Sequence, residues 1–328
     1  MNSSMNPLVS VVLPVYNRPS VVNTIDSILN QDYDNFELII IDNCSEDNTV
    51  NLIKAYNDSR IRLVCNSKNM GQTFSISKGL MLARGKYVAR IDADDIATTD
   101  RLSKQVDFME KNEDYGFCGS WVQFITDNNV KTYVIKTCQT DKGLRFLQTV
   151  VCGMYHPCVL IRNEILHKYN INYNSNYHMA EDYDLWFQLL CVTKGMNIPN
   201  VLLYYRRGSN NDSKIHAKLV RKEYFEVREK ICRSFISDNK ELETMLNVLR
   251  IEKKDKRNIF DAVYLLGFYK KYLNKYMSIK DADYHVVRKS IRNQVVTSLL
   301  TYNEDVIFIV LKHLYEFVKR VYIKSKGE

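Results

Sequence analysis

The sequence is 328 residues long, with 26% charged residues, 45% hydrophobic residues and a net charge of +8. This composition is typical of a globular protein and excludes collagen-like, low-complexity and disulfide-rich secreted chains. No uncharged apolar run reaches about eighteen residues, so no membrane span is expected, and residues 1–7 lack a signal-peptide pattern. The eight cysteines form no Cys-x-x-Cys pair, which indicates reduced thiols of a cytoplasmic protein and neither disulfides nor a zinc site.

Apolar runs alternate with amphipathic segments in the first part of the chain. Strands are predicted at residues 9–14, 36–41 and 60–65, and a fourth runs from Tyr87 into an acidic cluster. We expect Asn17 to cap the first intervening helix and Ser45 to begin the second. The alternation predicts an α/β fold with a doubly wound, mostly parallel sheet.

Three carboxylates, Asp92, Asp94 and Asp95, follow the fourth predicted strand within four positions. The carboxyl end of such a strand is where open α/β sheets place ligands. Three acids repel one another unless a cation lies among them, and carboxylate oxygens suit Mg²⁺ or Mn²⁺. The alternative is a solvated acidic turn.

Phosphate-binding loops of other enzyme classes are absent from the sequence. No Gly-x-Gly-x-x-Gly follows the first strand, and the segment from Gly79 to Gly85-Lys86 is one residue too long for a Walker loop. Dinucleotide oxidoreductases and P-loop hydrolases are therefore poor fits.

The next part of the chain contains two further features. Residues 115–121 and 131–135 are predicted strands, and Glu181 and Asp182 begin a helix with an apolar face. Helix capping would explain these two acids, because the helix dipole favours negative charge there. Residues 201–207 are predicted to form the closing strand.

The basic excess belongs to the carboxyl-terminal third. Residues 1–213 hold 21 Lys and Arg against 23 Asp and Glu, whereas residues 214–328 hold 25 against 15. We therefore predict a first domain over 1–213 and a helical basic region over 214–328. The run from Val306 to Val321 is amphipathic; it fits either internal packing or an anionic membrane surface, while no nucleic-acid-binding module accompanies the charge.

Several motifs in order resemble the family 2 glycosyltransferases of the GT-A fold. They are residues 9–17 (VSVVLPVYN), 41–49 (IDNCSEDNT), 69–71 (NMG), and 83–87 (ARGKY) leading into Asp92-Ala93-Asp94-Asp95. The resemblance covers roughly residues 8–207. Asn43 and Cys44 stand where the family usually has Asp-Gly, and Ser77 stands where Asn is common.

The resemblance implies a nucleotide-diphosphate sugar donor, most simply a UDP-sugar, and one divalent ion, Mn²⁺ or Mg²⁺. The ion would be held by Asp94 and Asp95. The residues implied to bind the nucleotide sugar lie at the strand ends: Pro14, Val15, Tyr16, Asn17, Asp42, Asn69, Gly71, Asp92, Ala93, Asp94 and Arg206.

The resemblance also implies roles in catalysis and acceptor binding. Asp182 matches the catalytic base, with Glu181 beside it, and His156 would lie near the acceptor pocket. His156 could instead be structural, and Arg206 could pair either with diphosphate or with a neighbouring acid.

The function implied is an inverting transfer to a glycan or lipid-linked acceptor in surface polysaccharide synthesis, at the cytoplasmic face of the membrane. Two alternatives differ in class. A sugar-nucleotide nucleotidyltransferase would be expected to carry a Gly- and Arg-rich loop after the first strand, which residues 14–18 do not form. A catalytically inactive scaffold would be expected to lack Asp92, Asp94 or Asp182.

Overall fold

The computed structural model describes residues 6–207, 216–235, 239–240, 242–243, 246, 281 and 283–300. The chain divides into two compact units, one of residues 1–148 and 152–227 and the other of residues 149–151 and 228–328. The domain boundary expected at residue 213 stays a prediction.

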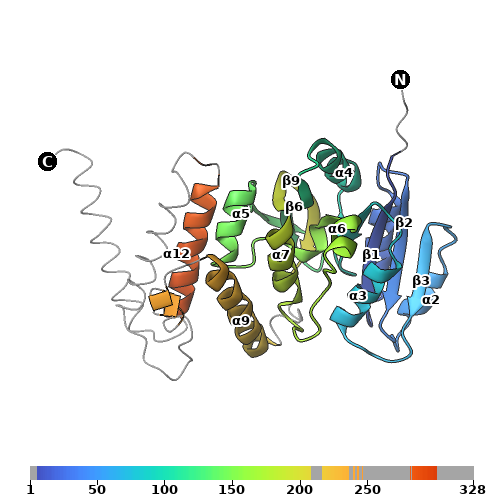
Figure 1. Ribbon diagram of the computed structural model, residues 1–328. Helices are drawn as coiled ribbons and strands as arrows, with labels where there is room; N and C mark the ends of the chain where they lie inside the picture. The colour runs from blue at the N-terminus through green and yellow to red at the C-terminus, as the bar shows by residue number, and fades with distance from the viewer. Residues whose placement is uncertain are drawn as a thin grey trace. The chain divides into compact units, whose positions relative to one another are not determined.

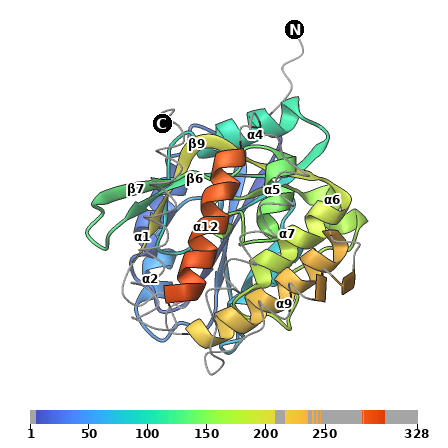
Figure 2. The ribbon, with the colours of Figure 1, turned by 90° about the vertical axis from the view of Figure 1, so that its left-hand side faces the viewer.

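A nine-stranded sheet forms the centre of the first unit (Figure 1). Its order is β3-β2-β1-β4-β8-β6-β9-β5, and β7 pairs with β6 in a hairpin at the margin (Figure 2). The strands are β1 (Val9–Val15), β2 (Phe36–Asp42), β3 (Ile61–Cys65), β4 (Tyr87–Arg90), β5 (Ile96–Ala97), β6 (Tyr115–Ile125), β7 (Lys131–Ile135), β8 (Leu160–Arg162) and β9 (Lys194–Arg206).

The directions of the strands confirm a mostly parallel sheet. β1 to β4 are mutually parallel, β8 is antiparallel to both β4 and β6, and β9 is parallel to β6. Since β5 and β7 are antiparallel to their neighbours, only β5, β7 and β8 run against the rest. The sequence predicted the parallel β1 to β4 but not the reversed strand β8, which joins the two halves of the sheet.

Helices alternate with these strands and follow them along the chain. They are α1 (Val21–Leu29), α2 (Thr49–Lys54), α3 (Gln72–Leu82), α4 (Arg101–Lys111), α5 (Asp141–Gln148), α6 (Asn163–Lys168), α7 (Glu181–Val192), α9 (Ala217–Phe235), α12 (Tyr284–Leu300) and the single 3₁₀ turn η1 (His156–Cys158).

Two predicted helix starts are wrong. The first helix begins after Ser20, because Asn17 adopts a positive φ of 44° and lies in the preceding turn. The second begins after Asn48 and not at Ser45. In both places the polar side chains form hydrogen bonds between the turns that follow β1 and β2, so they are not available to cap the helix.

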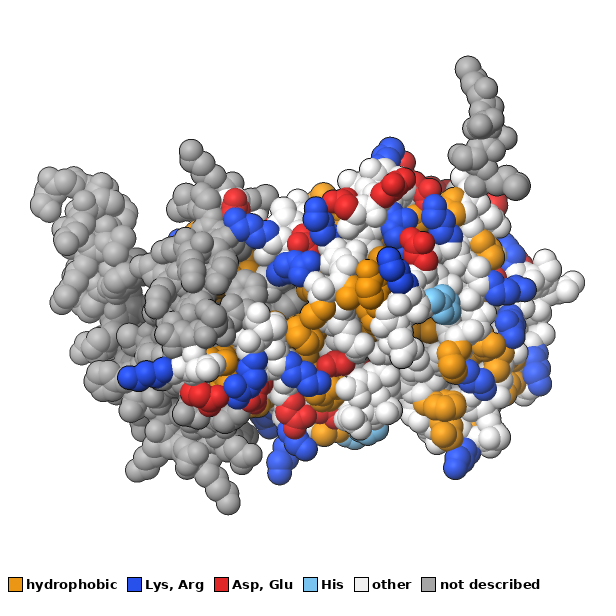
Figure 3. All heavy atoms as spheres, in the orientation of Figure 1, with side chains coloured by type: hydrophobic (Ala, Val, Ile, Leu, Met, Phe, Trp, Pro, Cys, Tyr) orange, Lys and Arg blue, Asp and Glu red, His pale blue; other side chains and the backbone are white. Residues whose placement is uncertain are grey.

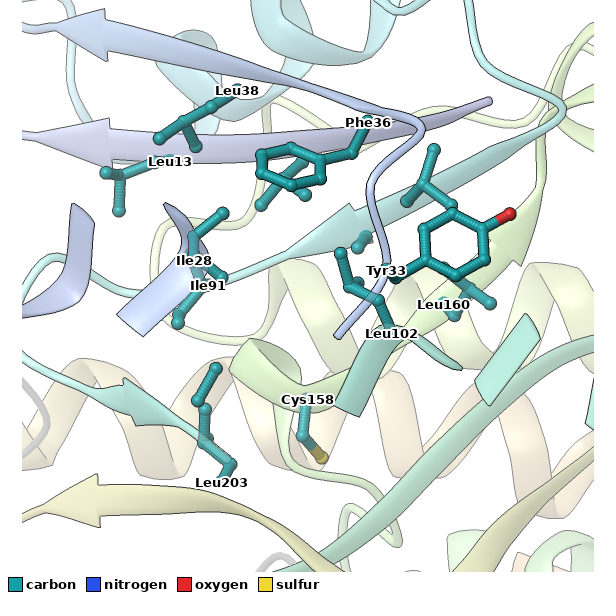
Figure 4. Packing of buried hydrophobic residues seen from close by; sticks show 14 of the residues in the cluster. Leu13, Ile28, Tyr33, Phe36, Leu38, Ile91, Leu102, Cys158, Leu160 and Leu203 are labelled. Atoms are coloured by element: carbon teal, nitrogen blue, oxygen red, sulfur yellow. The ribbon is translucent and has the colours of Figure 1, made fainter. Parts of the chain in front are cut away.

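A continuous apolar core explains why these elements pack together (Figure 4). Leu13 of β1 and Leu38 of β2 are fully buried, as is Ile28 of α1. The core continues through Leu160 of β8 to Leu203 of β9. Burying each such side chain stabilises the fold by about 1.5–3 kcal/mol.

The sheet topology fixes where a ligand site can form. From β1 the chain moves to β2 and β3 on one side, and then returns past β1 to β4. Right-handed crossovers therefore place α3, which packs on β1 and β2, on the face opposite α1. The order of strands reverses between β1 and β4, and ligands bind at the carboxyl ends beside such a switch point.

Fewer residues of the second unit are described. Cys232 of α9 contacts the carbonyl of Thr149, and Arg233 pairs with Glu229 and Glu243. The amphipathic run over residues 306–321 lies outside the described residues. Within the described part of the chain, no helix combines the length and apolar character needed to cross a membrane.

Candidate active site

The acidic cluster lies directly after β4, at the switch point. Arg90, the last residue of β4, is buried and holds Asp92 at two points, with Nη1 2.7 Å from Oδ2 and Nη2 2.5 Å from Oδ1. The cluster is therefore anchored by a buried cation on its own strand and is not a freely solvated turn.

Asp94 and Asp95 occupy different environments. The Asp94 side chain is 26% exposed, and among the described residues Arg18 forms an ion pair with it at 3.8 Å. Asp95 is buried, and its Oδ1 accepts a hydrogen bond from the backbone N–H of Arg206. Burial, followed by the charge of Asp92, raises the pKa of both carboxyls. Such a cluster favours a bound cation, because a cation would relieve the repulsion.

Arg206 holds the backbone of this acidic segment. Its Nε donates to the carbonyl of Asp94 at 2.8 Å, and Nη1 donates to the carbonyls of Thr126 and Asp127. Its Nη2 donates to Asn129 Oδ1 at 2.6 Å. The guanidinium thus contacts the backbone of the acidic segment and the β6–β7 turn, and its pairing with diphosphate or with a neighbouring carboxylate stays a prediction.

The ends of β1 and β2 are tied together by side chains. Register places Val15 opposite Asp42. The backbone N–H of Asn17 donates to Ser45 Oγ, and Asn17 Oδ1 accepts the N–H of Glu46. Asp42 is buried and accepts the N–H of Ser45. Of the predicted nucleotide residues here, Pro14 and Val15 are buried whereas Tyr16 is 43% exposed.

Asn43 organises the loop before α3. Its Nδ2 donates to Asn69 Oδ1 at 2.7 Å, and its Oδ1 accepts the backbone N–H of Met70 at 2.9 Å. Gly71 has a φ of 86° and open space where a Cβ would lie. The structure thus brings Asn69 and Gly71 to the end of β2, beside Asp42.

Glu181 and Asp182 open α7, as predicted. Glu181 is 7% exposed, and its Oε2 has no hydrogen-bond partner among the described residues. Burial and the charge of Asp182 raise the pKa of Glu181 to about 8. Burial also raises the pKa of Asp182 to about 6, against a hydrogen bond from the Tyr183 N–H to Oδ1. These values suit proton transfer near neutral pH.

The acidic cluster and the Glu181–Asp182 pair share one electrostatic environment. Burial is the largest cause of both shifts. Among the smaller causes, the charge of Arg90 lowers the pKa of both Glu181 and Asp182, and the charge of Asp92 raises both. Arg90 is thus the cation common to the two groups. Capping alone would not require a buried cation from a strand 91 residues earlier in the sequence.

His156 lies in the same region but is enclosed. Its Nε2 is 2.6 Å from the Tyr173 hydroxyl, and its Nδ1 is 3.9 Å from Glu181 Oε1. Burial and the charge of Arg90 hold the pKa of His156 well below its usual value, so the imidazole is neutral. Direct acceptor contact by His156 stays a prediction.

The residues of the acidic cluster fit a divalent ion only in part. In the portions of the chain that are described, no three His, Cys, Asp or Glu side chains converge on one point. Asp94 nevertheless offers a partly exposed carboxylate, and Asp95 Oδ2 is buried without a hydrogen-bond partner there. One or two carboxylates, completed by substrate phosphates and water, are what Mg²⁺ usually takes.

Three residues of this region were missed from the sequence. Arg90 sits within an apolar strand run, Arg18 follows the first strand, and the Tyr205 phenol has its pKa raised by burial and by Asp92, Asp95 and Asp94. A charged residue inside an otherwise apolar strand was the signal available for Arg90. On the face in Figure 3, acidic and basic side chains of the described residues are interspersed.

Comparison with known proteins agrees with this geometry. Residues 10–169 match the family described as glycosyl transferase family 2. The chain is 30% identical, over 61% of its length and 77% of the relative, to the UDP-Glc:α-D-GlcNAc-diphosphoundecaprenol β-1,3-glucosyltransferase WfaP of Escherichia coli.

Solved structures share the fold. A Staphylococcus aureus TarS fragment, residues 1–349, in complex with UDP-GlcNAc aligns with a TM-score of 0.56 and 16% identity, covering 88% of this chain and 89% of that one. The mannosyltransferase PcManGT of Pyrobaculum calidifontis, in complex with GDP-Man and Mn²⁺, aligns with a TM-score of 0.56 and 15% identity, covering 92% and 88%. The architecture is therefore the GT-A fold. At 30% identity the chain covers more than two thirds of the length of WfaP, and residues 10–169 match the family model, so the chain belongs to glycosyltransferase family 2.

Proposed function

We propose that this glycosyltransferase is metal-dependent and inverting, and that it moves a sugar from a UDP-sugar to a hydroxyl of a glycan or lipid-linked acceptor. The observation that carries this proposal is the common environment of the two acidic groups around Arg90. In this proposal Asp92 and Asp94 would form the donor end of the site and Asp182 its basic end; the Arg90–Asp92 pair and the effect of Arg90 on the pKa of Asp182 support it.

Support for the donor comes from the strand ends. Asp42, Asn69 and Gly71 would surround the nucleotide with Pro14, Val15 and Tyr16, and Asp92 and Ala93 would face the ribose and diphosphate. UDP is favoured over other nucleotides because WfaP, the relative at 30% identity, is named for a UDP-sugar donor.

Asp94 would hold a Mn²⁺ or Mg²⁺ ion, with Asp95 Oδ2 as a second oxygen. When bound, such an ion stabilises the negative charge on the departing nucleoside diphosphate. Arg206 bonds to the Asp95 carboxylate and to the Asp94 carbonyl, and would therefore hold both residues in place for the ion.

Asp182 would act as the general base. Its carboxylate accepts the proton of the acceptor hydroxyl as that oxygen forms a bond to the anomeric carbon and the bond to the diphosphate breaks. Attack comes from the face opposite the leaving group, so the anomeric configuration inverts. No covalent intermediate on the protein is required.

Support for the acceptor class comes from one relative and from the charge of the chain. WfaP is named for a diphosphoundecaprenol-linked acceptor, and a comparable acceptor here would place the protein at the cytoplasmic face of a membrane. The excess of basic residues after residue 213 would suit anionic lipid headgroups. We propose peripheral association on these grounds.

A panel of nucleotide sugars tests the function. The purified protein is incubated with each donor, Mn²⁺ and a lipid-linked GlcNAc acceptor, and the new linkage is read by NMR. We expect a UDP-sugar to be used and the linkage to have the opposite configuration. Retention of configuration would contradict the mechanism. Pyrophosphate release from UTP and a sugar phosphate would favour the nucleotidyltransferase, and failure to bind any nucleotide would favour the scaffold.

A further inference from the structure

A single carboxylate from α9 holds the backbone just before α7. Glu223 Oε2 accepts hydrogen bonds from the backbone N–H groups of three consecutive residues: His178 at 2.9 Å, Met179 at 2.7 Å and Ala180 at 3.1 Å. Glu223 is only 4% exposed. These three residues immediately precede Glu181 and Asp182.

Such an arrangement restrains a loop strongly. Hydrogen bonds to an ionised carboxylate are roughly twice as strong as neutral ones, and three that share one oxygen fix the direction of three peptide planes. The loop is also held from α3, where Thr73 Oγ1 donates to the carbonyl of Tyr177 at 3.3 Å. Its two ends are therefore tied to different helices.

The loop leads directly into the residue proposed as the base. Ala180 is the residue before α7, and its carbonyl accepts the N–H of Asp184 at 3.0 Å. Tyr224, adjacent to Glu223 on α9, has its pKa raised first by the charge of Asp182 and then by burial. The first part of α9 therefore lies close to Asp182 as well as to the loop.

We propose that Glu223 is a positioning residue for catalysis, which sets the place of Asp182 by fixing residues 178–180. This inference rests on the proposed function, in which Asp182 is the base. It also extends the catalytic machinery beyond residue 213, because Glu223 lies in the segment assigned from sequence to the carboxyl-terminal region.

Two substitutions test the proposal. Glu223→Gln keeps the side chain's shape and one carbonyl acceptor but loses the charge, whereas Glu223→Ala leaves the three N–H groups without their acceptor. We expect kcat to fall by about 10–100-fold in the Ala variant and by less in the Gln variant, because small misplacements of catalytic groups are costly. The KM for the donor and the Kd for UDP should stay within about twofold, since the donor residues are untouched.

Glu226→Ala is the matched control, because Glu226 lies on the same helix in an exposed pair with Lys222. It should keep wild-type kcat. A kcat in both Glu223 variants within about twofold of wild type, or a loss of UDP affinity that parallels the loss of kcat, would overturn the inference.

Asp182→Asn, assayed alongside, separates this inference from the proposed function. If Asp182→Asn transfers normally, the base assignment itself is wrong. If Asp182→Asn is inactive while both Glu223 variants are normal, only the positioning role fails.

Discussion

Arg90 and Asp92 lie two residues apart at the end of β4 and form a two-point ion pair with distances of 2.5 and 2.7 Å. The Arg90 side chain is 3% exposed and that of Asp92 25%. The guanidinium lies in the interior, where its charge also lowers the pKa of Glu181 and of Asp182. In the proposed mechanism this pair would lie between the donor end of the site and the basic end.

Replacing Arg90 should therefore affect both stability and the site. Arg90→Met leaves Asp92 without its buried partner, and removing one member of such a pair costs about 3 kcal/mol. We expect urea denaturation to show a loss of that order. Lys111→Met, which removes an exposed pair with Asp107, is the control and should leave the midpoint unchanged. An equal loss of stability in the two variants would show that the buried Arg90–Asp92 pair contributes no more to stability than an exposed pair.

Asp94→Asn should uncouple the donor from the metal. If Asp94 holds the ion, UDP-sugar affinity in Mn²⁺ should fall while the fold is retained, because Asn is a weaker ligand for hard cations. Calorimetry of UDP with Mn²⁺ and with EDTA measures the coupling for wild type and variant. Wild-type affinity that is the same in both solutions would remove the metal from the mechanism.

Asp182→Asn distinguishes catalysis from a structural role at the start of the helix. Ala180 is the N-cap of α7, so a structural role for Asp182 in the first turn would act through the helix dipole, which is worth only about 0.3–1 kcal/mol, and would predict little change in transfer. A base predicts transfer at least about a hundredfold slower, because general-base catalysis is typically worth that much or more. UDP-sugar binding and the melting temperature should stay near wild type. Near-normal transfer would exclude Asp182 as the base, and Glu181 would be the next residue to test.

Glu181→Gln should change how stability depends on pH. Because burial raises the pKa of Glu181 to about 8, its contribution to stability is full below about pH 4 and is lost as pH rises through 8. The Gln variant does not titrate, so its Tm relative to wild type should be higher at pH 8.5 than at pH 4.5, by about 2 °C or more.

Glu164→Gln provides the comparison for that experiment, because Glu164 is an exposed glutamate in the first turn of another helix, α6. It should show no such rise. A Tm difference for Glu181→Gln that is independent of pH would mean that folding does not raise the pKa of Glu181.

The basic carboxyl-terminal segment yields a further prediction from charge alone. Deletion from about Asp305 onward should reduce sedimentation with anionic vesicles, and salt should weaken the binding that remains. Neutral vesicles are the control. If the full-length protein does not bind anionic vesicles at low salt, the amphipathic run serves another purpose.

Local patterns predicted the strands and the acids, whereas long-range contacts could not be predicted. The apolar runs gave β1, β2 and β4 because a buried strand needs nothing more than such a run. Asp94 was found because it stands at the end of a strand run, whereas Asp182 was singled out by the resemblance to the family 2 glycosyltransferases. The roles of Arg206 and Glu223 depend on partners 112 and 45 residues away, which no local period encodes.

The hold of Arg206 on Asp94 and Asp95 has a consequence for biosynthesis. The acidic segment leaves the ribosome long before its anchor, which follows 111 residues after Asp95. At about 5–20 residues per second, the delay is roughly 5–20 s. A nascent chain stalled before β9 should therefore fail to retain UDP, whereas one stalled well beyond Arg206 should retain it. Pull-down of stalled ribosome complexes on immobilised UDP would show whether nucleotide binding appears only when the last strand of the sheet has emerged.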